Sequence, residues 1–419
     1  MESEDLPIVL LHVCSSWRRA ALCIPRLWSE LAVRFGDSQG ELLSLVIPNK
    51  ARDVEKWVYY GGRGPRRLRL AFDWSYGTPY DFKIPGACSE DVRHLEVITA
   101  ELYSPSIIDL LPTESTLAAL HTLIVWSESP PRTTRAMDLL PTTSDASQLC
   151  RVWIHNYEPF LSLDHGRDML PWSRLTHLVI ESPLSSIRQV VEACPHLLEA
   201  AFFVQHPTIL LQEREEPFAH KYLKRMTLFL SCVWIDIANL FVDQAYPALE
   251  SLQISSPETY SEIFDWNGFM TPFPSIKELY MGPRINSHED FSYNAFNAYN
   301  PFLDTLIIDQ SLDNEFEIVS ALGMRGLLQR RRDSETLAAL KRVILLFPFQ
   351  DEDGQGPEDL IAELQEELKE FTDSGLSLEI IVGSTPYRSM FSAASLFLPW
   401  SGTTWKKFRR DYSVYRSFA

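Results

Sequence analysis

Three apolar positions with the spacing x, x+3 and x+5 recur along this chain at a nearly constant step. Successive triplets begin 23 to 29 residues apart, and only the last step, of 37 residues, is longer. With 45% apolar residues single triplets are common, so the step rather than the triplet constrains the fold. The triplets are Leu42/Leu45/Ile47, Pro65/Leu68/Leu70, Val92/Leu95/Val97, Leu120/Leu123/Val125, Leu149/Val152/Ile154, Leu175/Leu178/Ile180, Leu198/Ala201/Phe203, Leu223/Met226/Leu228, Leu249/Leu252/Ile254, Ile276/Leu279/Met281, Leu303/Leu306/Ile308 and Leu340/Val343/Leu345.

A period of about 20–29 residues with an L-x-x-L-x-L core is typical of leucine-rich repeats. Positions x+3 and x+5 share one face of a strand, because strand side chains alternate. Residues 186–194 and 357–371 have the apolar spacing and caps of helices. The sequence therefore predicts an α/β solenoid, a horseshoe with parallel strands inside and helices outside. Its repeats are irregular, because the asparagine that usually follows the last apolar position is absent.

We expect three parts: a helical segment at residues 1–35, the solenoid at 36–383 and a C-terminal part at 384–419. The long last step predicts an extra helix around Arg330, Arg331 and Arg332, whose arginines are a solvated helix end or, less simply, a nuclear-localisation signal. The C-terminal part has six basic and nine aromatic residues. It is interpreted as a cap, with an intramolecular partner of the preceding acidic helix and a docking segment as alternatives.

Composition excludes several function classes. A net charge of -18 argues against nucleic-acid binding, which needs a basic surface. The six cysteines form no C-x-x-C pair and have no histidine at metal-ligand spacing, so neither a disulfide framework nor a metal site is expected. No apolar run reaches the length of a membrane span, and a cytoplasmic or nuclear location is expected. No catalytic or cofactor-binding motif is present, so we expect a binding protein rather than an enzyme.

The N-terminal segment carries a second pattern, V-C-x-x-W-R-x-x-A-x-x-x-P-x-L-W, from Val13 to Trp28. It resembles the second half of an F-box, most closely the fungal F-box-like proteins whose F-box leads into degenerate leucine-rich repeats. The resemblance implies a substrate receptor of a Skp–cullin–F-box ubiquitin ligase. It also implies that the Skp-type adaptor contacts Val13, Trp17, Leu27 and Trp28, while the repeats hold the protein to be ubiquitinated.

Under the F-box interpretation, the first helix of the F-box is missing. Leu6-Pro7 stands only ten residues before Trp17, whereas the family places its L-P motif roughly thirty residues before that tryptophan. We therefore expect weak binding of the adaptor at most. Two interpretations stay open: the start of the chain is truncated, or the remnant has become a hydrophobic cap in which Trp17 and Trp28 cover the first repeat. Solenoids need such caps at their ends.

Residues at x+2, x+4 and x+6 are expected to face the concave side of the horseshoe. Aromatic and arginine side chains on such a surface are the usual anchors of a protein interface. An alternative is that a neighbouring segment folds over these side chains. The candidate partner-binding residues are Trp126, Arg151, Trp153, His155, His177, Phe202, Arg225 and Phe229.

Two functions stay open at this point. The first is a ligase substrate receptor, and the second is a repeat scaffold that binds a protein partner without a ligase. Neither requires a cofactor, and the partner's identity is not encoded in these patterns.

Overall fold

The computed structural model is a mixed α/β protein with two compact units, Met1–Glu181 (unit 1) and Ser182–Ala419 (unit 2), and each is described by itself. The C-terminal part at 384–419 and the repeat expected at Leu42 lie outside the described residues. The structure describes residues 14–24, 28–36, 57, 59, 66–73, 91–99, 117–127, 146–155, 170–182, 186–204, 217–230, 241, 243–255, 269–282, 300–309, 321–347 and 357–382.

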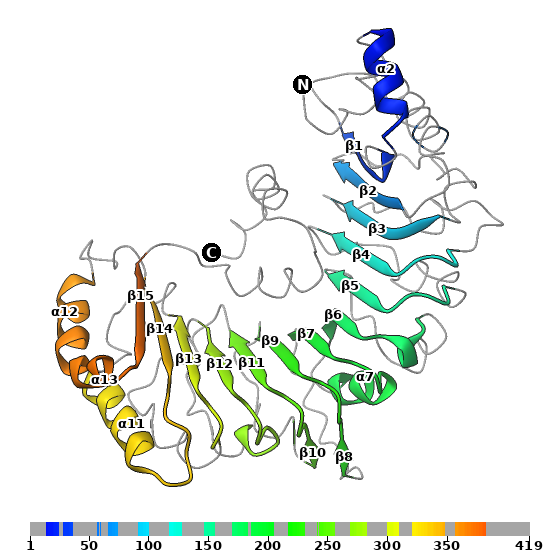
Figure 1. The fold of residues 1–419 in the computed structure, drawn as a ribbon. Coiled ribbons are helices and arrows are strands. Elements are labelled where there is room, and N and C mark those ends of the chain that lie inside the picture. Colours follow the sequence, from blue (N-terminus) through cyan, green and yellow to red (C-terminus); the bar gives the residue numbers. More distant parts are fainter. Residues whose placement is uncertain are drawn as a thin grey trace. The chain divides into compact units, whose positions relative to one another are not determined.

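Unit 1 consists, in its described part, of a helix, six strands and a short 3-10 helix. The strands are all parallel and pair in chain order, as Figure 1 shows. Helix α2 (Ser15–Leu22) comes first and η5 (Trp172–Arg174) precedes the last strand. The strands are β1 (Glu30–Gly36), β2 (Arg66–Asp73), β3 (Val92–Thr99), β4 (Thr122–Ser127), β5 (Arg151–His155) and β6 (His177–Ser182), which ends at the unit boundary.

Unit 2 has seven described strands in its main sheet, and these are also parallel and paired in chain order. Two further short strands, β8 (Phe218–Ala219) and β10 (Gln244–Ala245), form a separate parallel pair. The main strands are β7 (Glu199–Val204), β9 (Arg225–Leu230), β11 (Ser251–Ser255), β12 (Glu278–Met281), β13 (Thr305–Asp309), β14 (Arg342–Phe347) and β15 (Ser377–Val382).

The helices expected in unit 2 are confirmed. Helix α7 (Ile187–Ala193) lies before β7, and the extra helix with the three arginines is α11 (Ala321–Asp333). The segment 357–371 forms α12 (Glu358–Glu367) and then α13 (Lys369–Asp373). Among the helices of the described residues, none is both long and apolar enough to cross a membrane.

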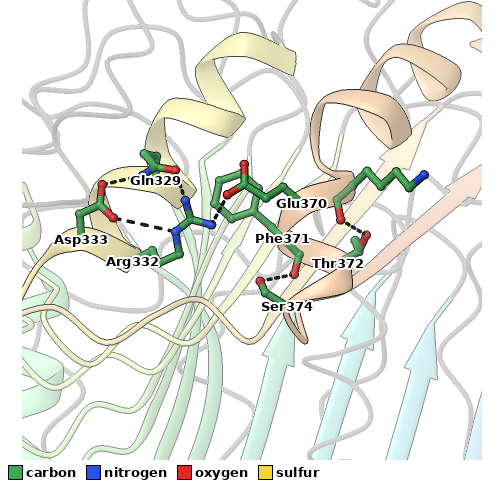
Figure 2. A network of polar contacts seen from close by, with 8 residues as sticks. Gln329, Arg332, Asp333, Glu370, Phe371, Thr372 and Ser374 are labelled. Atoms are coloured by element: carbon green, nitrogen blue, oxygen red, sulfur yellow. Dashed lines mark hydrogen bonds and ion pairs between the residues drawn. The ribbon is translucent and has the colours of Figure 1, made fainter.

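Helices α11, α12 and α13 are tied together by two arginines of α11, and Figure 2 shows one of them, Arg332, beside Glu370 and Phe371 of α13. Arg332 is 2.7 Å from the Glu370 carboxylate and lies 4.8 Å above the ring of Phe371. Arg325 pairs with Glu367 of α12 at 2.7 Å. Arg331 is 1% exposed, so it is neither a solvated helix end nor an accessible part of a localisation signal. Its guanidinium donates to the carbonyl oxygens of Asn300, Leu303 and Ala338, which holds the long β13–β14 connection in place.

From the β3 repeat to the β14 repeat, the x, x+3 and x+5 residues are buried. Leu249, Leu252 and Ile254 are all 0% exposed, and Leu252 is in register with Met226 of β9 and Leu279 of β12. In many repeats the amide of residue x donates to the carbonyl oxygen of residue x-3, as Leu249 does to Tyr246. The residue at x-3 is then buried too, so the core contains a fourth position that the triplets do not show.

His220 occupies this fourth position in the β9 repeat and makes the turn with its side chain. Its Nδ1 accepts a hydrogen bond from the Leu223 amide at 3.0 Å, and its Nε2 lies 2.9 Å from the Cys194 carbonyl oxygen. Because a carbonyl oxygen only accepts, Nε2 carries the proton and the ring is neutral. Burial lowers the pKa of His220, although the bond to Cys194 acts in the opposite direction.

The expected register is wrong in the β7 repeat. The structure aligns Ala200 with Met226 and Phe202 with Leu228, both of which are core residues of β9. The Lys224 amide donates to the Leu198 carbonyl oxygen, and the equivalent bond in the next repeat joins Glu250 to Lys224. The triplet is therefore Leu197/Ala200/Phe202, one residue earlier than expected.

Both ends of the repeat series differ from the expectation. The strand beside β2 is β1, in which Leu31 and Val33 pair with Leu68 and Leu70, so a triplet that the expected series does not include begins at Trp28. At the other end β15 adds a strand, because Leu378 pairs with Val343 of β14. The x position of this last repeat is Gly375, whose positive φ of 111° suits glycine. A triplet search that requires an apolar residue at x misses it.

Candidate functional site

The candidate partner-binding residues of unit 1 lie on three neighbouring strands. Arg151 of β5 is the register partner of His177 of β6, and Trp126 of β4 is the partner of His155 of β5. The side chains of Trp126 and His155 lie outside the described part of the structure. Trp153 of β5 is in register with Ile124 of β4 on one side and with Val179 of β6 on the other.

Trp153 is only 2% exposed, so the expectation of an exposed tryptophan is wrong for the chain by itself. Its neighbours at x+4, Ile124 and Val179, are 2% and 0% exposed. Neighbouring strands lie about 4.8 Å apart, so side chains in the same row pack against one another. The accessible candidates in unit 1 are Arg151 and His177 at x+2, where the strands begin, and both are partly exposed.

Three candidates lie in unit 2, and the register correction changes one of them. Phe202 is 0% exposed and belongs to the core positions, so its assignment to the concave face is wrong. Phe203 takes its place and stacks on Phe229 at a centroid distance of 4.5 Å. Phe229 is itself 8% exposed, whereas Arg225 is exposed and lies 3.7 Å from the Glu199 carboxylate.

The F-box-like residues separate into two environments. Trp17 on α2 is 56% exposed, while Trp28 is 1% exposed and donates its indole N–H to the Ala21 carbonyl oxygen at 2.8 Å. Ala21 is the buried residue of α2, so Trp28 both begins the first repeat and holds this helix. Val13 and Leu27 lie outside the described residues.

Sequence reasoning overlooked the x+1 row, which lies beside Arg151 in unit 1. The His121 amide donates to the Arg93 carbonyl oxygen at 2.8 Å, and the Cys150 amide donates to the His121 carbonyl oxygen at 3.1 Å, so the row crosses β3, β4 and β5. Sulfur Sγ of Cys150 lies 3.1 Å from Nε2 of His121. The signal that could have found this row was the repeat step itself, applied to position x+1.

Burial and neighbouring positive charges lower the pKa of two imidazoles in this region, those of His177 and His121. The pKa of His177 is lowered to about 4 by burial and by the charges of Arg151 and His121. Burial likewise lowers the pKa of His121, with Arg151, Arg93 and His94 acting in the same direction. Burial raises the pKa of the Cys150 thiol, so this cysteine is not an activated nucleophile despite its histidine neighbour. Among the described residues no group of histidine, cysteine and acidic side chains could hold a metal ion.

Glu96 is the acid on the x+4 row of β3. Burial acts to raise its pKa, but the charge of Arg69 and the bonds from His94 and Arg69 lower it below the usual value. Arg69 lies 3.2 Å and His94 4.0 Å from its two oxygens. Glu96 is thus an ionised group that is committed to these two partners.

Comparisons with known proteins place the chain in no family. No family model and no curated protein matches it. Among solved structures, a structural-genomics target from Bacteroides fragilis is 14% identical, covers 65% of this chain and 68% of its own length, and has a TM-score of 0.36. A likeness at that level carries no argument about function, so the sites above stand on their own geometry.

Proposed function

We propose that this chain is a protein-binding protein with degenerate leucine-rich repeats, arranged as a horseshoe, and that it serves as the substrate receptor of a Skp–cullin–F-box ubiquitin ligase. The in-register parallel strands, each with the same buried positions, support the repeat part of this proposal. Stacked repeats bury their cores against neighbours and leave extended rows of side chains available to a partner. The receptor would act in the cytoplasm or nucleus.

The single observation that carries the ligase part is the exposed apolar surface at α2. Trp17, Leu22 and Ile24 are 56%, 38% and 46% exposed, within and just after an eight-residue helix. Large apolar side chains that gather at a protein surface typically mark an interaction site. Tryptophan is also enriched among the residues that dominate binding energy. We therefore assign adaptor contact to Trp17, whereas the buried Trp28 holds the helix through its bond to Ala21.

A second candidate function rests on Trp28. Its burial and its bond to Ala21 suit a cap on the first repeat, which a non-ligase scaffold needs as much as a ligase receptor does. In that case α2 covers the end of the solenoid and the repeats alone engage a protein partner. The accessible residues for this purpose are Arg151, His177 and Arg225 at x+2.

The test compares binding of a purified Skp-type adaptor to the full chain and to two variants of α2. Trp17→Ala should weaken adaptor binding by about tenfold or more, because it removes an exposed aromatic anchor. Arg19→Ala is the matched control, since Arg19 is exposed on the same helix, and it should leave the affinity nearly unchanged. Thermal melts of all three proteins should coincide.

Deletion of residues 1–28 is a poorer test because it also removes Trp28 from the core. Adaptor binding that is weak but dependent on Trp17 would support the ligase receptor. Absence of adaptor binding in the wild-type chain would favour the scaffold. Equal losses for both variants would show that the contact does not depend on Trp17 specifically.

A further inference from the structure

In the repeats with strands β2 to β6 of unit 1, the x+1 and x+2 positions form a row that contains no acidic residue, whereas the β1 repeat has Glu30 at x+2. In the five repeats with strands β2 to β6, from Arg66-Arg67 to Thr176-His177, these ten positions hold four arginines, three histidines, two threonines and a cysteine. We call this row the basic edge. The whole chain has a net charge of -18, so the average composition of the chain does not explain a row without acidic residues.

The same positions in unit 2 are built differently. There, basic and acidic residues alternate at position x+1 from one repeat to the next, and residues of neighbouring repeats form ion pairs. Lys277 lies 3.0 Å from Glu250, and Lys341 lies 3.1 Å from Asp304. Charge compensation is therefore the arrangement in unit 2, and the basic edge departs from it.

The centre of the basic edge has two guanidiniums and a neutral imidazole without acidic partners among the described residues. Arg93, His121 and Arg151 follow one another on β3, on the residue before β4, and on β5, and none of them forms an ion pair there. The Nε atom of Arg151 is buried and has no hydrogen-bond partner. Glu96 does not compensate them, because it is held by Arg69 and His94.

The electrostatics of the histidines agree with this geometry. His121 faces Arg93 and His94 from β3 and Arg151 from β5, and these charges, after burial, lower its pKa. Burial is the largest cause and the neighbouring positive charges add to it, so a bound anion would raise the pKa of the imidazole again. An arginine guanidinium presents a planar fork of donors that suits an oxyanion.

We propose that the basic edge, centred on Arg93, His121 and Arg151, binds a phosphate group. Two guanidiniums can share the charge and several oxygens of a dianion, whereas a single carboxylate brings one charge and two oxygens. The group can arrive as free phosphate or as a monoester on a larger molecule. This inference goes beyond the proposed function and does not depend on adaptor binding.

The test titrates the full chain with inorganic phosphate and with glycerol 2-phosphate by isothermal calorimetry, at constant ionic strength and with acetate as the monoanion control. Arg151→Gln should weaken phosphate binding by about tenfold or more, because it removes a charged donor fork. Lys277→Gln, which removes a lysine from the compensated row of unit 2, should leave the binding unchanged. Thermal melts identify a variant that fails to fold, and Arg93→Gln then replaces it.

Binding of both phosphates that is lost in Arg151→Gln supports the site, and binding of glycerol 2-phosphate alone supports it with a monoester as the source. Three results would overturn the proposal: no binding of either phosphate, acetate binding of equal strength, or an equal loss in Lys277→Gln. Adaptor binding is measured separately, so the two proposals fail independently.

Discussion

Leu252 gives the sharpest test of the repeat register. The side chain is fully buried between Met226 and Leu279, its register partners on both sides. Truncation to alanine removes three carbons, worth about 0.8 kcal/mol each in transfer from water, or roughly 2.4 kcal/mol. Because the backbone ladder holds both neighbours in place, the cavity closes little, and we expect a total loss of about 3–4 kcal/mol in the free energy of unfolding.

The matched variant is Gln253→Leu on the opposite face of the same strand. Gln253 is 6% exposed, and its amide nitrogen is buried without a hydrogen-bond partner, so its replacement by an apolar side chain of similar volume should be neutral or stabilising by about 1 kcal/mol. Urea unfolding followed by far-UV circular dichroism measures both. A loss below about 1 kcal/mol for Leu252→Ala together with a larger loss for Gln253→Leu would refute the register.

Three further predictions use the same unfolding assay. Gly282→Ala should cost about 1–3 kcal/mol in the free energy of unfolding, because the new Cβ would lie 2.7 Å from the Cα of Ser255. Gly326→Ala, with open space around it in α11, should stabilise by about 0.5–1 kcal/mol. Similar effects of the two substitutions would contradict the close approach at Gly282. Arg331→Met should cost about 3 kcal/mol or more because three carbonyl oxygens lose their donor, and a neutral result would show that solvent replaces it. His220 has a lowered pKa in the folded chain, so the unfolded chain binds its proton more readily; stability should fall as the pH drops below about 6.5, and His220→Gln should fall less steeply between pH 7 and 5.

The sequence predicts the register of a repeat correctly where only one set of apolar residues fits the triplet. It misplaces the register where neighbouring apolar residues allow two sets. From Val92 to Leu175 every expected triplet has its register confirmed. In the β7 repeat, leucine, alanine and phenylalanine each occur twice in succession, at 197–198, 200–201 and 202–203, so two registers fit the pattern. Only the backbone ladder to β9 selects between them.

The candidate site shows the same division. Periodicity placed Trp153, Arg151 and His177 on one face, and their register confirms it. Periodicity gave no information on how deeply each side chain is buried, and the x+4 residues Trp153, Ile124 and Val179 are almost fully buried. The basic edge escaped notice since its residues lie 26 to 29 residues apart along the chain. Its lack of acidic residues becomes visible only when the rows are aligned and compared between units.

The central claim is that the repeats bind a protein and that α2 connects the complex to a ligase. Quantitative mass spectrometry of proteins captured with the full chain after cross-linking tests it most directly, with Trp17→Ala and Arg19→Ala captured in parallel. The account predicts a Skp-type adaptor and a cullin that diminish in Trp17→Ala alone, together with a further protein that all three retain. Recovery of no protein above a mock capture, or loss of every captured protein in Trp17→Ala, would contradict it.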